Sequence, residues 1–63
     1  MPVITVEMWE GRSIEIKKKL VKDITDVVSE NLNCPKDVVT IILKDSPKYN
    51  WSLGGELASN KLK

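Results

Sequence analysis

Residues 2–9 read PVITVEMW, a run rich in the β-branched residues that favour extended backbone. Because side chains alternate along a strand, this run divides into two faces. One face carries Ile4, Val6 and Met8, and the other carries Val3, Thr5, Glu7 and Trp9. The stretch therefore predicts a strand that is mostly buried on one side.

An amphipathic helix is predicted to follow this strand. Gly11 suits a turn, and Ser13 suits the N-cap of a helix that begins at about Ile14. Pro35 prevents the helix from continuing much beyond residues 31–33. Apolar residues recur at helical spacing, and we expect them to form one stripe that faces a core: Ile16, Leu20, Val21, Ile24, Val27, Val28 and Leu32.

A second strand is predicted over residues 38–44, VVTIILK, which are almost uninterrupted in their apolar character. Strand, helix and strand then make one βαβ unit, whose strands run parallel with a right-handed crossover. Residues 45–57 combine turn-forming residues with two aromatic ones, which predicts a short hairpin or lid. The expected fold class is α/β: a single βαβ unit with a parallel two-stranded sheet and a C-terminal hairpin.

The size of the chain predicts one domain, residues 1–63, that depends on partners. A domain of this length buries only about 60% of the surface its unfolded chain exposes. A single cysteine, Cys34, allows no intramolecular disulfide, and the lack of histidine excludes the usual zinc sites and His-based triads. Parallel sheets are normally covered on both faces, yet one helix covers one face. We therefore expect a homo-oligomer and no metal site.

Charge and targeting signals exclude several kinds of partner. Ten basic and nine acidic residues leave a net charge of +1, which gives no field for attracting nucleic acid or an anionic membrane. The first residues, MPVITVEMWE, lack the basic region of a signal peptide, and no apolar run is long enough to span a bilayer. The expected location is cytoplasmic.

Pro2 is a candidate base, since removal of Met1 would turn it into an N-terminal secondary amine. An ordinary α-amino group has a pKa of about 7.7–8.0, and burial lowers this value further. Such an amine can carry protons at neutral pH. Judged alone, however, Pro2 more simply marks the start of a strand, where its missing N–H does no harm.

Several features together resemble a 4-oxalocrotonate tautomerase of the tautomerase superfamily, over essentially the whole chain. They are Pro2, the Glu10-Gly11-Arg12-Ser13 turn, the amphipathic helix, the second strand and the segment WSLGGEL at 51–57. The resemblance implies a homohexamer built as a trimer of dimers, with active sites near subunit boundaries and no cofactor. It also implies that processed Pro2 acts as general base and then general acid, moving a proton within a dienol or keto acid.

The resemblance implies further roles in the site. Arg12 would bind a substrate carboxylate and draw electron density along the conjugated chain, as a guanidinium does through bidentate hydrogen bonds. Trp51 would make the pocket apolar and lower the pKa of the proline. On the residues alone, Arg12 more simply faces solvent just before the helix, and Trp51 more simply packs in a subunit interface.

The chain departs from the family pattern at Thr40, where 4-oxalocrotonate tautomerases carry a second arginine. A threonine hydroxyl donates one neutral hydrogen bond, and loss of a charge-stabilising donor commonly raises a barrier by roughly 2.7–4 kcal/mol. Lys44 shares the strand face but lies about 13 Å further along at ~3.3 Å per residue, so within one subunit it is a poor substitute.

The leading hypothesis is therefore an isomerase that interconverts enol and keto forms of a small 2-oxo acid. Thr40 makes a monocarboxylate enol, such as that of an aryl pyruvate, an alternative to a dicarboxylate substrate. Two other functions stay open: a proline-based decarboxylase or dehalogenase, and an oligomeric family member that has lost the chemistry.

Overall fold

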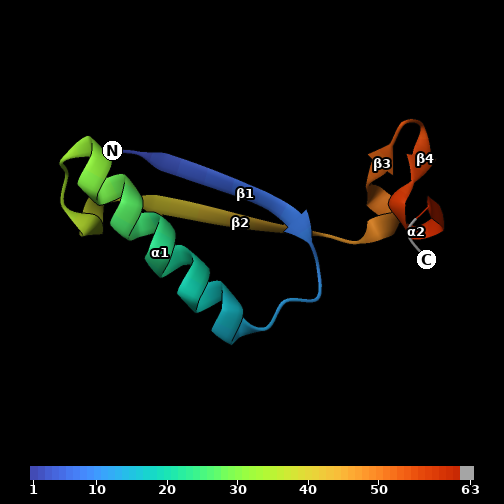
Figure 1. Cartoon of the computed structure of the whole chain (residues 1–63), viewed down its shortest axis with the longest axis horizontal. Coiled ribbons are helices and arrows are strands. Elements are labelled where there is room, and N and C mark those ends of the chain that lie inside the picture. The colour runs from blue at the N-terminus through green and yellow to red at the C-terminus, as the bar shows by residue number, and fades with distance from the viewer. Residues whose placement is uncertain (62–63) are drawn as a thin grey trace.

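A computed structural model describes residues 1–61 of the chain, in which a βαβ unit precedes a small C-terminal hairpin (Figure 1). The two long strands, β1 and β2, form a parallel sheet, and the short strands β3 and β4 pair antiparallel. Helix α1 packs on one face of the long sheet, and the hairpin projects beyond the far end of β2 (Figure 1). The predicted α/β fold class is confirmed. The elements are β1 Val3–Trp9, α1 Ile14–Leu32, η1 Lys36–Val38, β2 Thr40–Ser46, η2 Lys48–Asn50, β3 Ser52–Leu53, β4 Glu56–Leu57 and α2 Ala58–Lys61.

Both ends of α1 agree with the prediction, because the helix begins at Ile14 after the expected N-cap Ser13 and ends at Leu32, ahead of Pro35. The Ser13 hydroxyl accepts a hydrogen bond from the backbone N–H of Ile16 at 3.2 Å. Gly11 turns the chain ahead of the helix with a φ of 117°, which a residue with a side chain rarely adopts. At the other end, Asn33 takes the left-handed conformation and its N–H donates to the carbonyl of Ser29.

The second strand begins and ends two residues later than the predicted span of 38–44. Val38 belongs to a 3-10 turn that starts after Pro35, and its N–H donates to the Pro35 carbonyl at 3.3 Å. At the other end, the ladder with β1 continues until Trp9 pairs with Ser46, although the side chains there are polar. Pairing to β1 thus sets the length of the strand. The short helix α2, Ala58–Lys61, is an additional element that was not predicted from the sequence.

The apolar stripe predicted on α1 is only partly covered within one chain. Val21, Ile24 and Val28 are half-buried, but Ile16 is 54% exposed and Leu32 is 60% exposed. The two-stranded sheet of one chain therefore covers only part of this stripe. No helix within residues 1–61 has both the length and the apolar character needed to cross a bilayer.

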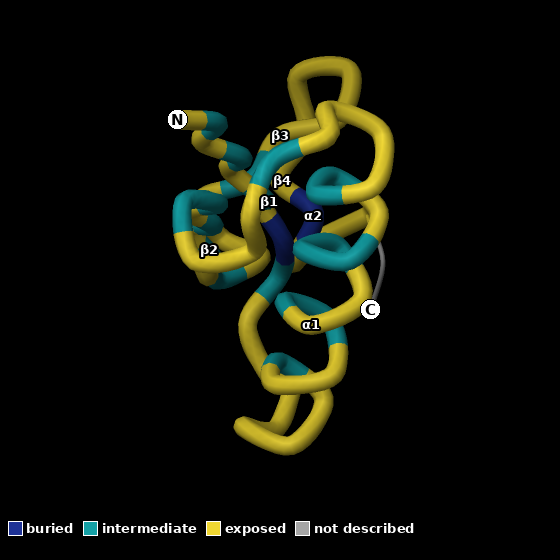
Figure 2. The backbone as a smooth tube through the Cα atoms, turned by 90° about the vertical axis from the view of Figure 1, so that its left-hand side faces the viewer, coloured by how far each residue is buried: buried dark blue, intermediate teal, exposed yellow. Residues whose placement is uncertain are grey.

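The chain by itself has almost no core, as the scarcity of buried residues in Figure 2 shows. Within the described residues, only Met8 and Ala58 are buried hydrophobic residues. The radius of gyration is 14.7 Å, whereas a compact domain of this length would have about 11 Å. On the sheet face opposite α1, Val3 is 62% exposed and Ile42 is 44% exposed. A flat, open unit of this kind needs further apolar surface to cover it.

Candidate active site

Pro2 and Thr40 lie side by side at the beginning of the sheet. The carbonyl of Pro2 accepts a hydrogen bond from the backbone N–H of Thr40 at 3.0 Å, and Thr40 pairs with Val3 in the strand register. This contact follows from the parallel pairing, because the first residues of both strands meet at the same edge. Two of the four residues predicted for the site are therefore neighbours.

A largely apolar groove of about 390 Å³ adjoins Pro2. Its polar member is Asn31, whose amide donates to the carbonyl of Val27 at 2.7 Å and is thus already engaged. Because burial disfavours the charged form of an amine, surroundings of this kind lower the pKa of an amino group placed in them. The groove is lined by Pro2, Val3 and Ile4 and, from α1, by Val27, Val28, Asn31 and Leu32.

Arg12 lies just beyond the opposite end of β1, in the turn that leads into α1. Its Nη1 donates a hydrogen bond of 2.8 Å to the carbonyl of Trp9, which ties the exposed guanidinium to the end of the strand. A guanidinium has five N–H donors in a rigid fork, so this bond leaves most of them available for an anion.

Trp51 packs against Trp9 beside this arginine. The two rings meet edge to face, with centroids 5.8 Å apart and planes at 74°. Lys48 places its Nζ 4.9 Å from the centroid of the Trp9 ring, within cation–π distance. Trp9, Arg12, Lys48 and Trp51 thus form one group of contacts, which we call the Trp9 cluster.

The two parts of the predicted site lie at opposite ends of β1. Pro2 and Thr40 stand at its beginning, whereas the Trp9 cluster stands at its end. The strand has seven residues, so its first and last residues are six steps apart, which at ~3.3 Å per step is about 20 Å. One chain therefore does not bring Pro2 to Arg12 or to Trp51, and a small molecule could not touch both ends.

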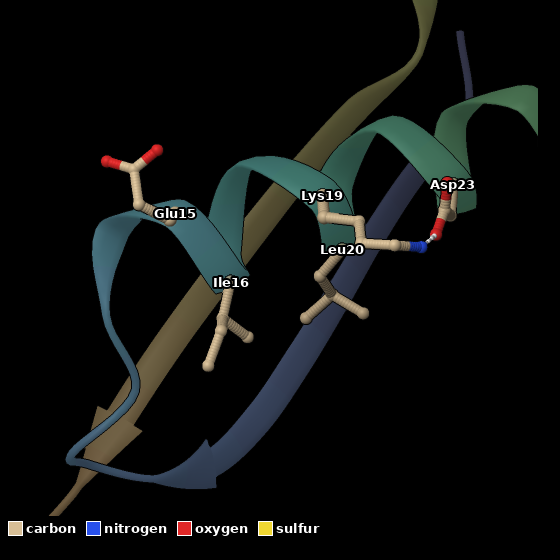
Figure 3. A pocket seen from close by; sticks show the side chains of 5 residues that line it. All are labelled: Glu15, Ile16, Lys19, Leu20 and Asp23. Atoms are coloured by element: carbon tan, nitrogen blue, oxygen red, sulfur yellow. Dashed lines mark hydrogen bonds and ion pairs between the residues drawn. The ribbon is translucent and has the colours of Figure 1, made fainter.

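A second pocket, also of about 390 Å³, lies on α1 and contains none of the predicted site residues (Figure 3). Figure 3 shows Ile16 and Leu20 projecting from the same side of the helix, while Lys19 reaches Asp23 at 2.6 Å. It is another part of the uncovered apolar surface. Among residues 1–61, no three His, Cys, Asp or Glu side chains gather closely enough to hold a metal ion.

Trp9 and Lys48 were not among the residues predicted for the site. The sequence could have indicated Trp9 as a site residue, because Trp9 lies on the outward face of the first strand and directly precedes the Glu10-Gly11-Arg12 turn. Lys48 carries no such signal, since only the fold of η2 brings it over the Trp9 ring.

Comparison with known proteins gives a consistent result. The family model described as tautomerase enzyme matches residues 2–61. A probable tautomerase of Listeria innocua is 46% identical over 55 residues, covering 87% of this chain and 90% of the relative. A 2-hydroxymuconate tautomerase of Pseudomonas putida is 36% identical over 59 residues, covering 94% of each. The crystal structure of TomN, a 4-oxalocrotonate tautomerase homologue in the tomaymycin biosynthetic pathway, is 30% identical with a TM-score of 0.93, covering 97% of this chain and 94% of TomN.

Proposed function

The chain belongs to the tautomerase family, and from this premise we propose that it is a cofactor-independent tautomerase. In this proposal it is an isomerase that interconverts the enol and keto forms of a small 2-oxo acid. The observation that carries the proposal is that the match to the tautomerase enzyme model begins at Pro2. The proposed base is thus the first residue of the region shared with the family.

Pro2 acts as the proton carrier once Met1 has been removed. Its amine takes the proton of the enol hydroxyl, and the resulting ammonium returns a proton to carbon, which yields the keto form. The apolar groove beside Pro2 supports this role, because apolar surroundings favour the neutral form of an amine over its charged form. While Met1 is attached, the nitrogen of Pro2 is an amide and is not basic.

The complete site forms between subunits. Since about 20 Å of β1 separates Pro2 from the Trp9 cluster, Pro2 and Thr40 of one chain must meet Arg12 and Trp51 of another. The exposed apolar side chains on α1 and on the open sheet face support an assembly of this kind. We propose a homohexamer built as a trimer of dimers, as the resemblance to 4-oxalocrotonate tautomerases implies.

Within such a site, Arg12 holds the substrate carboxylate and stabilises the negative charge that develops on the conjugated system. Trp51 supplies an apolar wall that excludes water. Thr40 offers its hydroxyl as a neutral donor near the oxygen that changes between enol and keto forms. The relative named 2-hydroxymuconate tautomerase makes that dicarboxylate the first substrate to test, and Thr40 makes the enol of an aryl pyruvate the second.

The test is ketonisation of 2-hydroxymuconate and of phenylenolpyruvate, followed by ultraviolet absorbance with protein whose mass confirms loss of Met1. Turnover that disappears in Pro2→Ala at unchanged assembly size is the expected result. Pro35→Ala is the matched control, because it changes a proline that does not line the groove beside Pro2 and should retain activity. Activity that survives Pro2→Ala contradicts the mechanism. Absence of turnover with either substrate would favour a proline-based decarboxylase or dehalogenase, or an inactive family member.

A further inference from the structure

We propose that Trp9 is a specificity-determining residue and that, together with Trp51, it selects a substrate with an aryl or similarly planar apolar group and a single carboxylate. This inference rests on the proposed function, since it concerns the same site. It starts from the Trp9 cluster, in which Trp51 and Lys48 of the η2 segment contact the indole of Trp9 and Arg12 binds its backbone carbonyl.

The arrangement of the two rings gives the shape of the surface. Their planes stand at 74°, so they form a nearly right-angled apolar corner. A planar group can stack on one ring while its edge meets the other, which is the geometry that aromatic pairs prefer. An aliphatic chain would fill the same corner with fewer contacts.

Arg12 lies at the correct place to hold a carboxylate beside this corner. Its Nη1 is bonded to the carbonyl of Trp9 itself, so the guanidinium and the indole project from adjoining parts of the chain. A carboxylate bound by the remaining N–H groups of Arg12 would therefore leave the attached carbon chain next to the rings.

The available charge fits one carboxylate better than two. Lys48 is the other cation of the cluster, but its Nζ lies over the Trp9 ring, where the π-system already engages it. The residue beside Pro2 is the neutral Thr40. A second carboxylate would thus meet no free cation among these residues.

Packing alone holds Trp9 in this orientation. The indole Nε1 of Trp9 is buried and has no hydrogen-bond partner within residues 1–61. Trp51 meets the ring edge to face and Lys48 lies over it, so both contacts help to determine how it is presented. A phenyl ring at position 9 should therefore preserve much of the apolar corner, whereas a leucine should not.

The first test measures kcat/KM for phenylenolpyruvate and for 2-hydroxymuconate in processed wild-type protein and three variants. We expect Trp9→Leu to lower the ratio of kcat/KM for phenylenolpyruvate to kcat/KM for 2-hydroxymuconate by roughly tenfold. This is within the range of discrimination that contacts in apolar pockets provide. Trp9→Phe should restore most of the ratio. Tyr49→Leu is the matched control, because Tyr49 is an exposed aromatic of the same segment. If Trp9→Leu lowers kcat/KM equally for both substrates, the inference is overturned. It is also overturned if kcat/KM falls only for the dicarboxylate.

The second test needs no turnover, so its failure can be told apart from failure of the proposed function. The assembled Pro2→Ala protein, labelled with ¹⁵N, is titrated with phenylacetate or succinate while the Trp9 indole signal, assigned with Trp9→Phe, is followed by NMR. A larger shift at lower concentration with phenylacetate supports the inference. Equal shifts, or a preference for succinate, overturn it even if wild-type protein shows Pro2-dependent turnover.

Discussion

The backbone N–H of Thr40 donates a hydrogen bond of 3.0 Å to the carbonyl of Pro2, which fixes position 40 beside the proposed base. A charge added there should stabilise the enolate end of a dicarboxylate. We expect Thr40→Arg to raise kcat/KM for 2-hydroxymuconate roughly tenfold or more, since one charge-stabilising donor is worth about 2.7–4 kcal/mol in such sites. Steady-state kinetics on the processed, assembled protein measures the effect.

Thr40→Gln is the control for this gain, because it lengthens the side chain without adding charge. It should leave kcat/KM for the dicarboxylate near the wild-type value. A gain of the same size in both variants would show that side-chain length, and not charge, limits the reaction.

Arg12 is expected to act through its charge and its fork geometry together. Arg12→Ala should raise KM and lower kcat for a carboxylate substrate, with a loss of roughly tenfold to a hundredfold in kcat/KM, as for a hydrogen bond to a charged group. Arg12→Lys should recover only part of this loss, because an ammonium cannot bind bidentately. Lys18→Ala, an exposed change on α1, serves as the control. An unchanged kcat/KM in Arg12→Ala would remove Arg12 from the site.

The elements that the sequence predicts well are those with a local cause. The alternation in residues 2–9 is reproduced in β1, where Met8 is buried and Val3 is exposed. The ends of α1 follow from Ser13 and Asn33, which act on their immediate neighbours. The later start of β2 had a local cause too, but the 3-10 turn after Pro35 was not recognised.

The features that escaped prediction depend on pairing between distant segments. Polar residues such as Asp45 and Ser46 remain in β2 because their backbone pairs with β1, and no side-chain pattern records that pairing. The contact between Trp9 and Trp51 likewise arises only after η2 turns the chain back. The contact between the Pro2 carbonyl and the Thr40 N–H depends on the same parallel pairing. The distance between Pro2 and Arg12 follows from the length of β1 and points to a site shared by subunits.

Lys48 should stabilise the Trp9 cluster without acting as an anion site. Lys48→Met nearly keeps the length of the side chain but removes the cation over the Trp9 ring. A cation–π interaction contributes about 0.5–1 kcal/mol at exposed sites. We expect a small decrease in Tm at fixed protein concentration and a broader Trp9 indole NMR signal. Lys44→Met, on β2, is the control for loss of a positive charge. A selective loss of activity toward the dicarboxylate in Lys48→Met would instead identify Lys48 as a second carboxylate site.

Asp26 should contribute to the loss of stability in acid. Hydrogen bonds from Lys36 and then Lys22, at 2.9 and 3.0 Å, hold the pKa of Asp26 below its ordinary value of 3.8. A lowered pKa in the folded state stabilises the fold above the ordinary value, and this contribution is lost as pH falls through the folded-state pKa. We expect Asp26→Asn to lower Tm at neutral pH and to flatten the fall in Tm between about pH 5 and about pH 3.

Asp23→Asn is the control for the acid effect, because among residues 1–61 Asp23 forms an ion pair only with its helix neighbour Lys19, whereas Lys36 joins Asp26 to η1. Thermal unfolding by circular dichroism across this pH range compares the three proteins. Equal acid sensitivity in wild type and Asp26→Asn would show that the ion pairs of Asp26 do not contribute.

A site shared by two subunits makes a strong prediction for mixed assemblies. Pro2→Ala should be inactive and Arg12→Ala should keep only about 1–10% of the wild-type kcat/KM, but in a mixture a chain that keeps Pro2 can meet a chain that keeps Arg12. If the two variants are unfolded and refolded together in equal amounts, random assembly should restore about one quarter of the wild-type sites. Each variant refolded alone, and Pro2→Ala refolded with the double variant, are the controls. Ketonisation of the preferred substrate reports the recovery. If Pro2 and Arg12 acted within one chain, no active site could form in the mixture, because every chain lacks one of the two residues.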